Sequence, residues 1–280
     1  KTQSDILETT KKNIHSGEYE AEVTTELIGL DKKYSDLKKA ELIFKKNKIE
    51  KKYKNVKCIL TKKNLGFGKA NNIGLYTAKT NYVLLLNPDT KLKRDTVNIL
   101  IKNANKIKNF ALLAPSIIDE KDKNYGFFQK NNILNKDNKN NLFEVDFVKG
   151  FAMFFNKKKF KKIKFFDEKI FLYLEEIDLC KRIKDAGEKN YIVPSAKIYH
   201  AGGMSHDLKF SYELELSRNW HWMWSLFYYN KKHYGFFCAF KITIGKLISS
   251  FFKFIFYIFV FRIDKSKIYL CRLLGLINSY

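Results

Sequence analysis

The chain has 280 residues, of which 45% are hydrophobic, and its formal net charge at neutral pH is +24. This apolar content is ample for a folded core, which argues against an intrinsically disordered chain. The four cysteines lie far apart without a CxxC pair, which argues against both a disulfide framework and a zinc site. The excess of lysine suits phosphate-bearing ligands, an anionic membrane surface or nucleic acid, and charge alone does not choose among them.

The N-terminal part of the sequence predicts a short helix over residues 6–14 and a strand over residues 26–30 that ends at Asp31. No charged segment followed by an apolar one occurs in the first thirty residues, so no secretory signal is expected. The protein is therefore expected to stay in the cytoplasm.

Strands and helices alternate through the next part of the chain. We predict helices over residues 37–52, 68–78 and 96–107, and strands over residues 56–60, 82–86 and 111–114. The strand at 82–86 is a continuous apolar run of the buried kind. Alternation at this spacing predicts βαβ units, and hence an α/β fold with a mainly parallel sheet.

The second half begins with a segment, residues 119–141, that is rich in Asn, Lys and Asp and is expected to form a loop or a lid. After it we predict a strand over residues 151–155 and a helix over residues 176–186 that ends at Gly187. Further strands are expected near residues 192 and 198.

The last sixty residues differ in character from the rest. Aromatic side chains crowd together from Trp220 to Tyr229, and residues 236–261 are apolar apart from three lysines. A transmembrane helix needs about 20 apolar residues, and no lysine-free run here is that long. Because Lys246 and Lys253 are one heptad apart, the pattern favours a helix that lies in the plane of a membrane surface. The alternative is a pair of helices in the protein core.

The motif Asn87-Pro88-Asp89-Thr90 follows directly after the strand at 82–86. Ligands of open α/β sheets bind beyond the carboxyl ends of the strands, so Asp89 is expected where such a site forms. A carboxylate at this place can hold Mg²⁺ or Mn²⁺, which bridge diphosphate oxygens. A proline turn without a ligand is the alternative.

A cluster of carboxylates, Glu175, Glu176 and Asp178, occupies the first turn of the helix predicted over residues 176–186. The helix dipole favours negative charge there, whereas the mutual repulsion of the carboxylates does not. Acidic first turns are common, but three acids beside aromatic residues indicate that one of them is a general base.

A third motif, residues 198–206, leads from a strand into a glycine-rich turn with two histidines, His200 and His206. A histidine at the end of a strand can bind a metal ion, contact a diphosphate or simply lie on the surface. The order of the three motifs along the chain is more informative than any one of them.

Together these motifs resemble family 2 glycosyltransferases, and among them the rhamnosyltransferase-like members. The resemblance covers roughly residues 4–234. It is carried by residues 64–74, 84–90 and 148–150, by Phe166-Asp167-Glu168, and by residues 175–180 and 200–205. It implies a GT-A fold, a nucleotide-diphosphate sugar as donor, a divalent metal ion, Mg²⁺ or Mn²⁺, and inversion at the anomeric carbon of the sugar.

The resemblance also implies roles for individual residues. Asp89 stands at the last acid of the family's DXD motif, as a ligand of the metal ion and the donor, and His200 stands at a histidine near the metal ion. Glu176 stands at the position of the catalytic base, with Glu175 as the adjacent acid. Donor contacts are implied for four further residues, Asp31, Asn64, Gly66 and Asn72, although Lys32 replaces the asparagine that usually follows the first of them.

We therefore expect a GT-A domain over residues 1–219, incomplete at its N-terminus, and a helical, membrane-associating extension over residues 220–280. The expected donor is a nucleotide-diphosphate sugar, with dTDP-rhamnose as one candidate, and the expected acceptor is a cell-surface glycan or a polyprenyl-linked precursor. The expected location is the inner face of the cell membrane, as a peripheral protein. The alternatives are a non-catalytic relative that binds nucleotide sugars, and a basic nucleic-acid-binding protein. No nucleic-acid-binding signature accompanies the charge, so no nucleic acid is expected as a partner.

Overall fold

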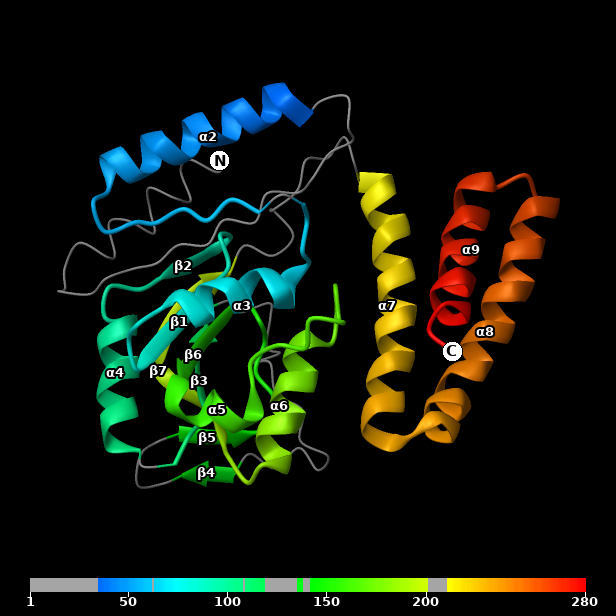
Figure 1. The fold of residues 1–280 in the computed structure, drawn as a ribbon. Coiled ribbons are helices and arrows are strands. Elements are labelled where there is room, and N and C mark those ends of the chain that lie inside the picture. Colours follow the sequence, from blue (N-terminus) through cyan, green and yellow to red (C-terminus); the bar gives the residue numbers. More distant parts are fainter. Residues whose placement is uncertain (1–34, 62, 108, 119–134, 138–141, 201–210) are drawn as a thin grey trace. The chain divides into compact units, whose positions relative to one another are not determined.

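The computed structural model describes residues 35–61, 63–107, 109–118, 135–137, 142–200 and 211–280 (Figure 1). The chain forms two compact units, one made of Lys1–Asp167 with Leu179–Ser205, the other of Glu168–Asp178 with His206–Tyr280. The helix and strand predicted near the N-terminus, and with them Asp31, lie outside the described residues.

A seven-stranded sheet forms the centre of the first unit (Figure 1). Its strands are β1 (Tyr82–Leu86), β2 (Thr90–Leu92), β3 (Leu112–Ile117), β4 (Asn135–Asp137), β5 (Leu142–Val145), β6 (Ala152–Asn156) and β7 (Asn190–His200). Their order in the sheet is β1-β6-β3-β7-β5-β4, and β2 pairs with the end of β7.

The strand directions correct one part of the prediction. The fold is α/β, but the sheet is mixed rather than mainly parallel. Among the described strands, β3 and β7 form the parallel pair, while β6 is antiparallel to both β1 and β3. The alternation of strands and helices gives β1, β3 and β7 a common direction, but it does not reveal that β6 lies between β1 and β3. The carboxyl ends of β1, β3 and β7 therefore meet at one edge, together with the start of β6.

Alternate side chains of the strands pack on opposite faces of the sheet, as the pleat requires. Phe155 packs in a cluster with side chains of α3 (Phe67–Thr77) and α6 (Glu175–Asp185), whereas its neighbour Phe154 packs in a second cluster with α4 (Thr96–Lys106). The short elements η2 (Lys157–Lys159) and α5 (Phe160–Ile163) follow β6 on the first face. The first unit thus has helices on both faces of its sheet (Figure 1).

The strand predicted over residues 56–60 is absent from the described structure. The preceding helix α2 (Ser35–Lys52) supplies the reason. The Nζ of Lys46 donates to the carbonyl of Cys58 at 2.6 Å, and the N–H of Cys58 donates to the carboxylate of Glu50 at 2.7 Å. Side chains of α2, rather than a neighbouring strand, therefore take the backbone hydrogen bonds of Cys58.

The second unit contains three long helices, α7 (Ser211–Tyr234), α8 (Phe236–Phe259) and α9 (Ile263–Ile277), which pack along one another (Figure 1). The predicted boundary between residues 219 and 220 falls inside α7, so the helical segment begins earlier than expected. Among the described helices, α8 is long and apolar enough to cross a membrane. The division of the chain into two functional domains stays a prediction.

Candidate active site

Two candidate residues of the first unit, Asp89 and His200, lie at the edge of the sheet where β1 and β7 end. After β1 the chain turns into β2, and two backbone hydrogen bonds fix this turn. The N–H of Asn87 donates to the carbonyl of Phe151 at 2.9 Å, and the N–H of Thr90 donates to the carbonyl of Asn87 at 3.1 Å. Because Thr90 pairs with His200 across β2 and β7, the two motifs that contain Asp89 and His200 meet at this edge.

Asp89 is buried at this edge, and its Oδ1 atom has no hydrogen-bond partner among the described residues. The Nε2 atom of His200 lies 3.6 Å from that oxygen, which is longer than a hydrogen bond. The interaction with His200 nevertheless lowers the pKa of Asp89, and burial, which opposes it, has the smaller effect. The result is an ionised carboxylate with one buried oxygen that accepts no hydrogen bond from the described residues.

His200 is held in place by an aromatic neighbour that the sequence did not identify. Its imidazole stacks on the ring of Phe151, with ring centroids 4.4 Å apart and an interplanar angle of 24°. Phe151 precedes β6, the strand whose position in the sheet was not predicted. This stacking restricts the orientations that the His200 ring can adopt.

The predicted donor contacts on the turn before α3 have clear local roles. The Oδ1 atom of Asn64 accepts a hydrogen bond from the N–H of Gly66 at 2.9 Å. Gly66 is the residue before α3 and has φ = 75°, a conformation that favours glycine. Asn64 and Gly66 thus shape the entry to α3, and their contact with a donor stays a prediction.

Asn72 is buried, and both polar groups of its amide have backbone partners. Its Nδ2 donates to the carbonyl of Phe166 at 2.9 Å, and its Oδ1 accepts from the N–H of Phe166 at 3.0 Å. These bonds tie α3 to the segment that contains Phe166-Asp167-Glu168, one of the motifs of the resemblance. The donor contact predicted for Asn72 stays untested.

The acidic pair, Glu175 and Glu176, belongs to the second compact unit, whereas Asp89 and His200 belong to the first. Glu175 is buried, and burial, followed by repulsion from Glu176, raises the pKa of Glu175 to about 8. Glu176 is only partly buried. At neutral pH Glu175 therefore keeps its proton, which leaves Glu176 as the accessible acid of the pair.

Asp178 has partners that the sequence did not predict. Its side chain is wholly buried, and its Oδ1 atom lies 2.6 Å from Nζ of Lys232 and 2.8 Å from Nε2 of His233. Both partners come from the last turn of α7. The sequence shows Asp178 only as one of a cluster of acids. No pattern in the sequence predicts its contacts with Lys232 and His233 of α7.

Solved structures share the fold of this chain. The mannosyltransferase PcManGT from Pyrobaculum calidifontis, in complex with GDP-Man and Mn²⁺, has a TM-score of 0.53 at 10% identity, over 98% of this chain and 83% of that one. Residues 1–349 of S. aureus TarS give a TM-score of 0.51 at 11% identity, over 99% of this chain and 88% of that one. The chain thus has the GT-A fold.

Sequence comparisons show that the chain is similar to glycosyltransferases. The family model described as "Glycosyl transferase family 2" matches residues 41–164 of the chain. Rhamnosyltransferase WbbL of Escherichia coli is 27% identical over 160 residues, which cover 48% of this chain and 60% of WbbL. The N-acetylglucosaminyl-diphospho-decaprenol L-rhamnosyltransferase of Mycobacterium tuberculosis is 25% identical over 183 residues, 53% of this chain and 60% of that protein. The chain therefore spans less than two thirds of these relatives.

Proposed function

We propose that this protein is an inverting glycosyltransferase that moves a sugar from a nucleotide-diphosphate donor to a hydroxyl of a cell-surface glycan precursor. The observation that carries the proposal is the pair Asp89 and His200 at the edge of the sheet where β1 and β7 end. The Nε2 atom of His200 lies 3.6 Å from the Oδ1 atom of Asp89, and this oxygen has no hydrogen-bond partner among the described residues. Such a place suits an anionic donor that is bound through a cation.

Asp89 and His200 are the residues that would hold Mg²⁺ or Mn²⁺. A buried, ionised carboxylate oxygen without a donor is costly, so the arrangement fits a bound cation. Among the described residues no group of three or more His, Cys, Asp or Glu side chains could bind a metal ion, so diphosphate oxygens and water would complete the ligand set. When bound, the cation would offset the negative charge that develops on the departing diphosphate.

Glu176 is the proposed general base. It takes the proton of the acceptor hydroxyl while the oxygen attacks the anomeric carbon from the face opposite the diphosphate. The bond from the anomeric carbon to the diphosphate oxygen breaks as the new bond forms, so the configuration inverts. The partly exposed position of Glu176, next to the protonated Glu175, supports this assignment.

The proposed donor sugar is rhamnose, with dTDP-rhamnose as the first donor to test. The two relatives named above, WbbL and the mycobacterial enzyme, are rhamnosyltransferases, and the name of the second includes a decaprenol-linked acceptor. We extend that acceptor chemistry to this chain as a sugar carried on a polyprenyl diphosphate. An acceptor of this kind is confined to a membrane.

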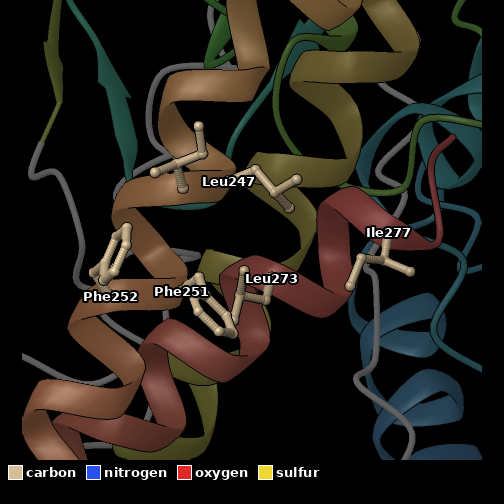
Figure 2. A pocket seen from close by; sticks show the side chains of 6 residues that line it. Leu247, Phe251, Phe252, Leu273 and Ile277 are labelled. Atoms are coloured by element: carbon tan, nitrogen blue, oxygen red, sulfur yellow. The ribbon is translucent and has the colours of Figure 1, made fainter.

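The proposed location is accordingly the cytoplasmic face of the cell membrane, and α8 is the proposed contact. This helix buries small or polar residues, Ala239, Thr243 and Ser250, and exposes large aromatic ones such as Phe252 and Phe259. Small residues at helix contacts and large apolar ones outside are typical of helices in lipid. The surface groove in Figure 2, between α8 and α9, is lined entirely by apolar side chains: Leu247, Ile248, Phe251, Phe252, Leu273 and Ile277.

Donor binding tests the proposal. Thermal unfolding of the chain is measured with a panel of nucleotide sugars, with and without Mn²⁺. We expect one donor to raise the unfolding temperature only when Mn²⁺ is present, because a bound ligand stabilises the folded state. Asp89→Asn should abolish this rise, whereas Asp95→Asn, which alters an exposed carboxylate of the same unit, should retain it. A wild-type chain that responds to none of the donors would contradict the proposal.

A further inference from the structure

The turn that leads into α6 has an unusual backbone. Tyr173 and Leu174, the two residues before Glu175, have φ values of 71° and 68°. L-residues with a side chain rarely adopt this left-handed conformation, and two in succession persist only where the surrounding structure enforces them. The backbone that presents the acidic pair therefore depends on contacts from elsewhere in the unit.

Helix α7 supplies those contacts, residue by residue. The hydroxyl of Ser225 donates to the carbonyl of Leu172 at 2.8 Å. The imidazole of His221 stacks on Phe171, with ring centroids 4.5 Å apart, and Trp222 meets Tyr173 edge to face at 5.5 Å. Three successive residues of the turn, 171–173, are thus each held by a side chain of the same helix.

Asp178 fixes the other end of the turn. Its backbone N–H donates to the carbonyl of the left-handed Leu174 at 2.8 Å, and its carboxylate accepts from Lys232 and His233 of α7. A carboxylate accepts hydrogen bonds only, so the Nε2 atom of His233 must carry the proton in this contact. A wholly buried carboxylate requires such partners, which makes the position of Asp178 depend on α7.

We propose that α7 is a clamp for the turn that carries the acidic pair, with Asp178 and Ser225 as positioning residues that aim Glu176 at the acceptor. The inference rests on the proposed function, because it gives the clamp a role in catalysis. Helix α7 also leads through Gly235 directly into α8, the proposed membrane contact. Helix α7 would thus connect the turn that carries Glu175 and Glu176 to α8, the proposed membrane contact.

Activity measurements test the catalytic part of the clamp. We expect Ser225→Ala to lower kcat three- to tenfold and Asp178→Asn to lower it tenfold or more, with the KM for the donor within twofold of wild type. Asp264→Asn is the matched control, because it breaks an exposed ion pair with Arg262 in the same unit and should leave kcat unchanged. A wild-type kcat in both Asp178→Asn and Ser225→Ala would overturn the proposal.

A double variant separates positioning from folding. Asp178→Asn leaves Lys232 without its charged partner, so the variant can lose stability, and adding Lys232→Met removes that charge. We expect the double variant to regain its unfolding temperature but not its kcat, because the bond from Lys232, one of the two side-chain contacts that join residue 178 to α7, is still missing. Recovery of kcat together with the unfolding temperature would show a purely structural role and overturn the proposal.

Hydrogen exchange gives a readout that needs no activity. In Ser225→Ala and in the double variant, the backbone amides of residues 171–178 should exchange at least tenfold faster, whereas Asp264→Asn should leave them unchanged. If the wild type binds no donor and transfers no sugar, the proposed function fails, and exchange alone then decides on the clamp. Unchanged exchange in both variants would overturn the clamp even in an active enzyme.

Discussion

Glu175 and Glu176 are neighbours in sequence, and burial gives them different chemistry. Glu175 is shielded from water and carries a raised pKa, whereas Glu176 is partly exposed. When two carboxylates lie side by side, the more buried one holds the proton and the other keeps the charge. This division fits the proposed roles, in which Glu176 is the base and Glu175 supports it.

Glu175 should make the stability of the protein depend on pH. Its pKa is raised from 4.5 to about 8 in the folded state, so between these values the folded state binds more protons than the unfolded state. Stability from this group is therefore present at low pH and is lost as the pH rises through about 8. Glutamine does not titrate, so the variant lacks this loss. We therefore expect the free energy of unfolding of Glu175→Gln, minus that of the wild type, to rise as the pH is raised from 5 to 8.5. A difference that stays constant over this range would contradict the raised pKa.

The two acids should also differ in turnover. We expect Glu176→Gln to lower kcat by roughly a hundredfold or more and to leave donor affinity unchanged, because general base catalysis contributes about that much. Glu175→Gln should lower kcat less, since the neutral amide resembles a protonated carboxyl group. Steady-state kinetics of the two variants decides between them. If Glu175→Gln has the larger effect, the base is Glu175.

The residues of the candidate site could be predicted in part from the sequence. Asp89 and His200 were recognised as strand-end residues, and the structure brings them together because β2 pairs with β7. Phe151 and the partners of Asp178 could not be predicted, because their contacts depend on the position of β6 and on the packing of α7. Asp31 lies outside the described residues, and the roles assigned to Asn64, Gly66 and Asn72 stay predictions.

At the scale of the elements, the close approach of α7 and α9 depends on one glycine. A Cβ atom at Gly275 would lie 2.4 Å from the backbone carbonyl oxygen of Trp220. Backbone atoms cannot rotate away as a flexible side chain can, so any larger residue would push the helices apart. By contrast, a Cβ atom at Gly245, on the exposed side of α8, would meet nothing within 4 Å.

These two glycines make a matched pair for a stability test. Gly275→Ala should destabilise the protein by about 1–3 kcal/mol, the usual cost of overpacking. Gly245→Ala should stabilise it by up to about 1 kcal/mol, because alanine favours an exposed helix interior more than glycine does. Thermal unfolding followed by circular dichroism measures both. Equal effects of the two substitutions would contradict the packing of α7 against α9.

The helices could be predicted because their periodicity is a local property of the sequence. The strands were predicted less well, because strand pairing joins segments that are distant in the sequence. Helices α2, α3, α4 and α6 lie within two residues of their predicted bounds. Residues 56–60 have the composition of a strand, but the bonds of Cys58 with Glu50 and Lys46 replace strand pairing. The expected strands near residues 192 and 198 are one strand, β7, whose register against β3 shifts between Pro115 and Ser116.

At the scale of the molecule, the net charge of +24 and the exposed aromatic side chains of α8 both support the proposed contact with an anionic membrane surface. Anionic lipid attracts basic residues, and each one near the surface contributes about 1 kcal/mol to binding. In the proposed membrane contact, the exposed aromatic side chains of α8 would enter the boundary between headgroups and acyl chains. The lysines of α8 argued in the sequence against a membrane span, yet the helix is long enough for one, so the mode of binding needs a test of its own.

Vesicle flotation supplies that test. We expect the chain to float with vesicles that contain anionic lipid, and high salt to release it, because a helix on the surface relies partly on charge. Phe252→Glu with Phe259→Glu should abolish flotation, whereas Phe44→Glu, at an exposed phenylalanine of α2, should not. Binding that resists both high salt and alkaline extraction would indicate that α8 spans the membrane. No binding to any vesicle would contradict a membrane contact.

The anomeric configuration of the product tests the proposed reaction most directly. The chain is incubated with Mn²⁺, a nucleotide-diphosphate sugar that it binds and a polyprenyl-linked acceptor, and the product is examined by NMR through the one-bond C–H coupling at the anomeric carbon. Attack from the face opposite the diphosphate predicts a configuration opposite to that of the donor. A product with the configuration of the donor would contradict the proposed mechanism, and donor binding without transfer to any acceptor would identify the chain as a non-catalytic relative.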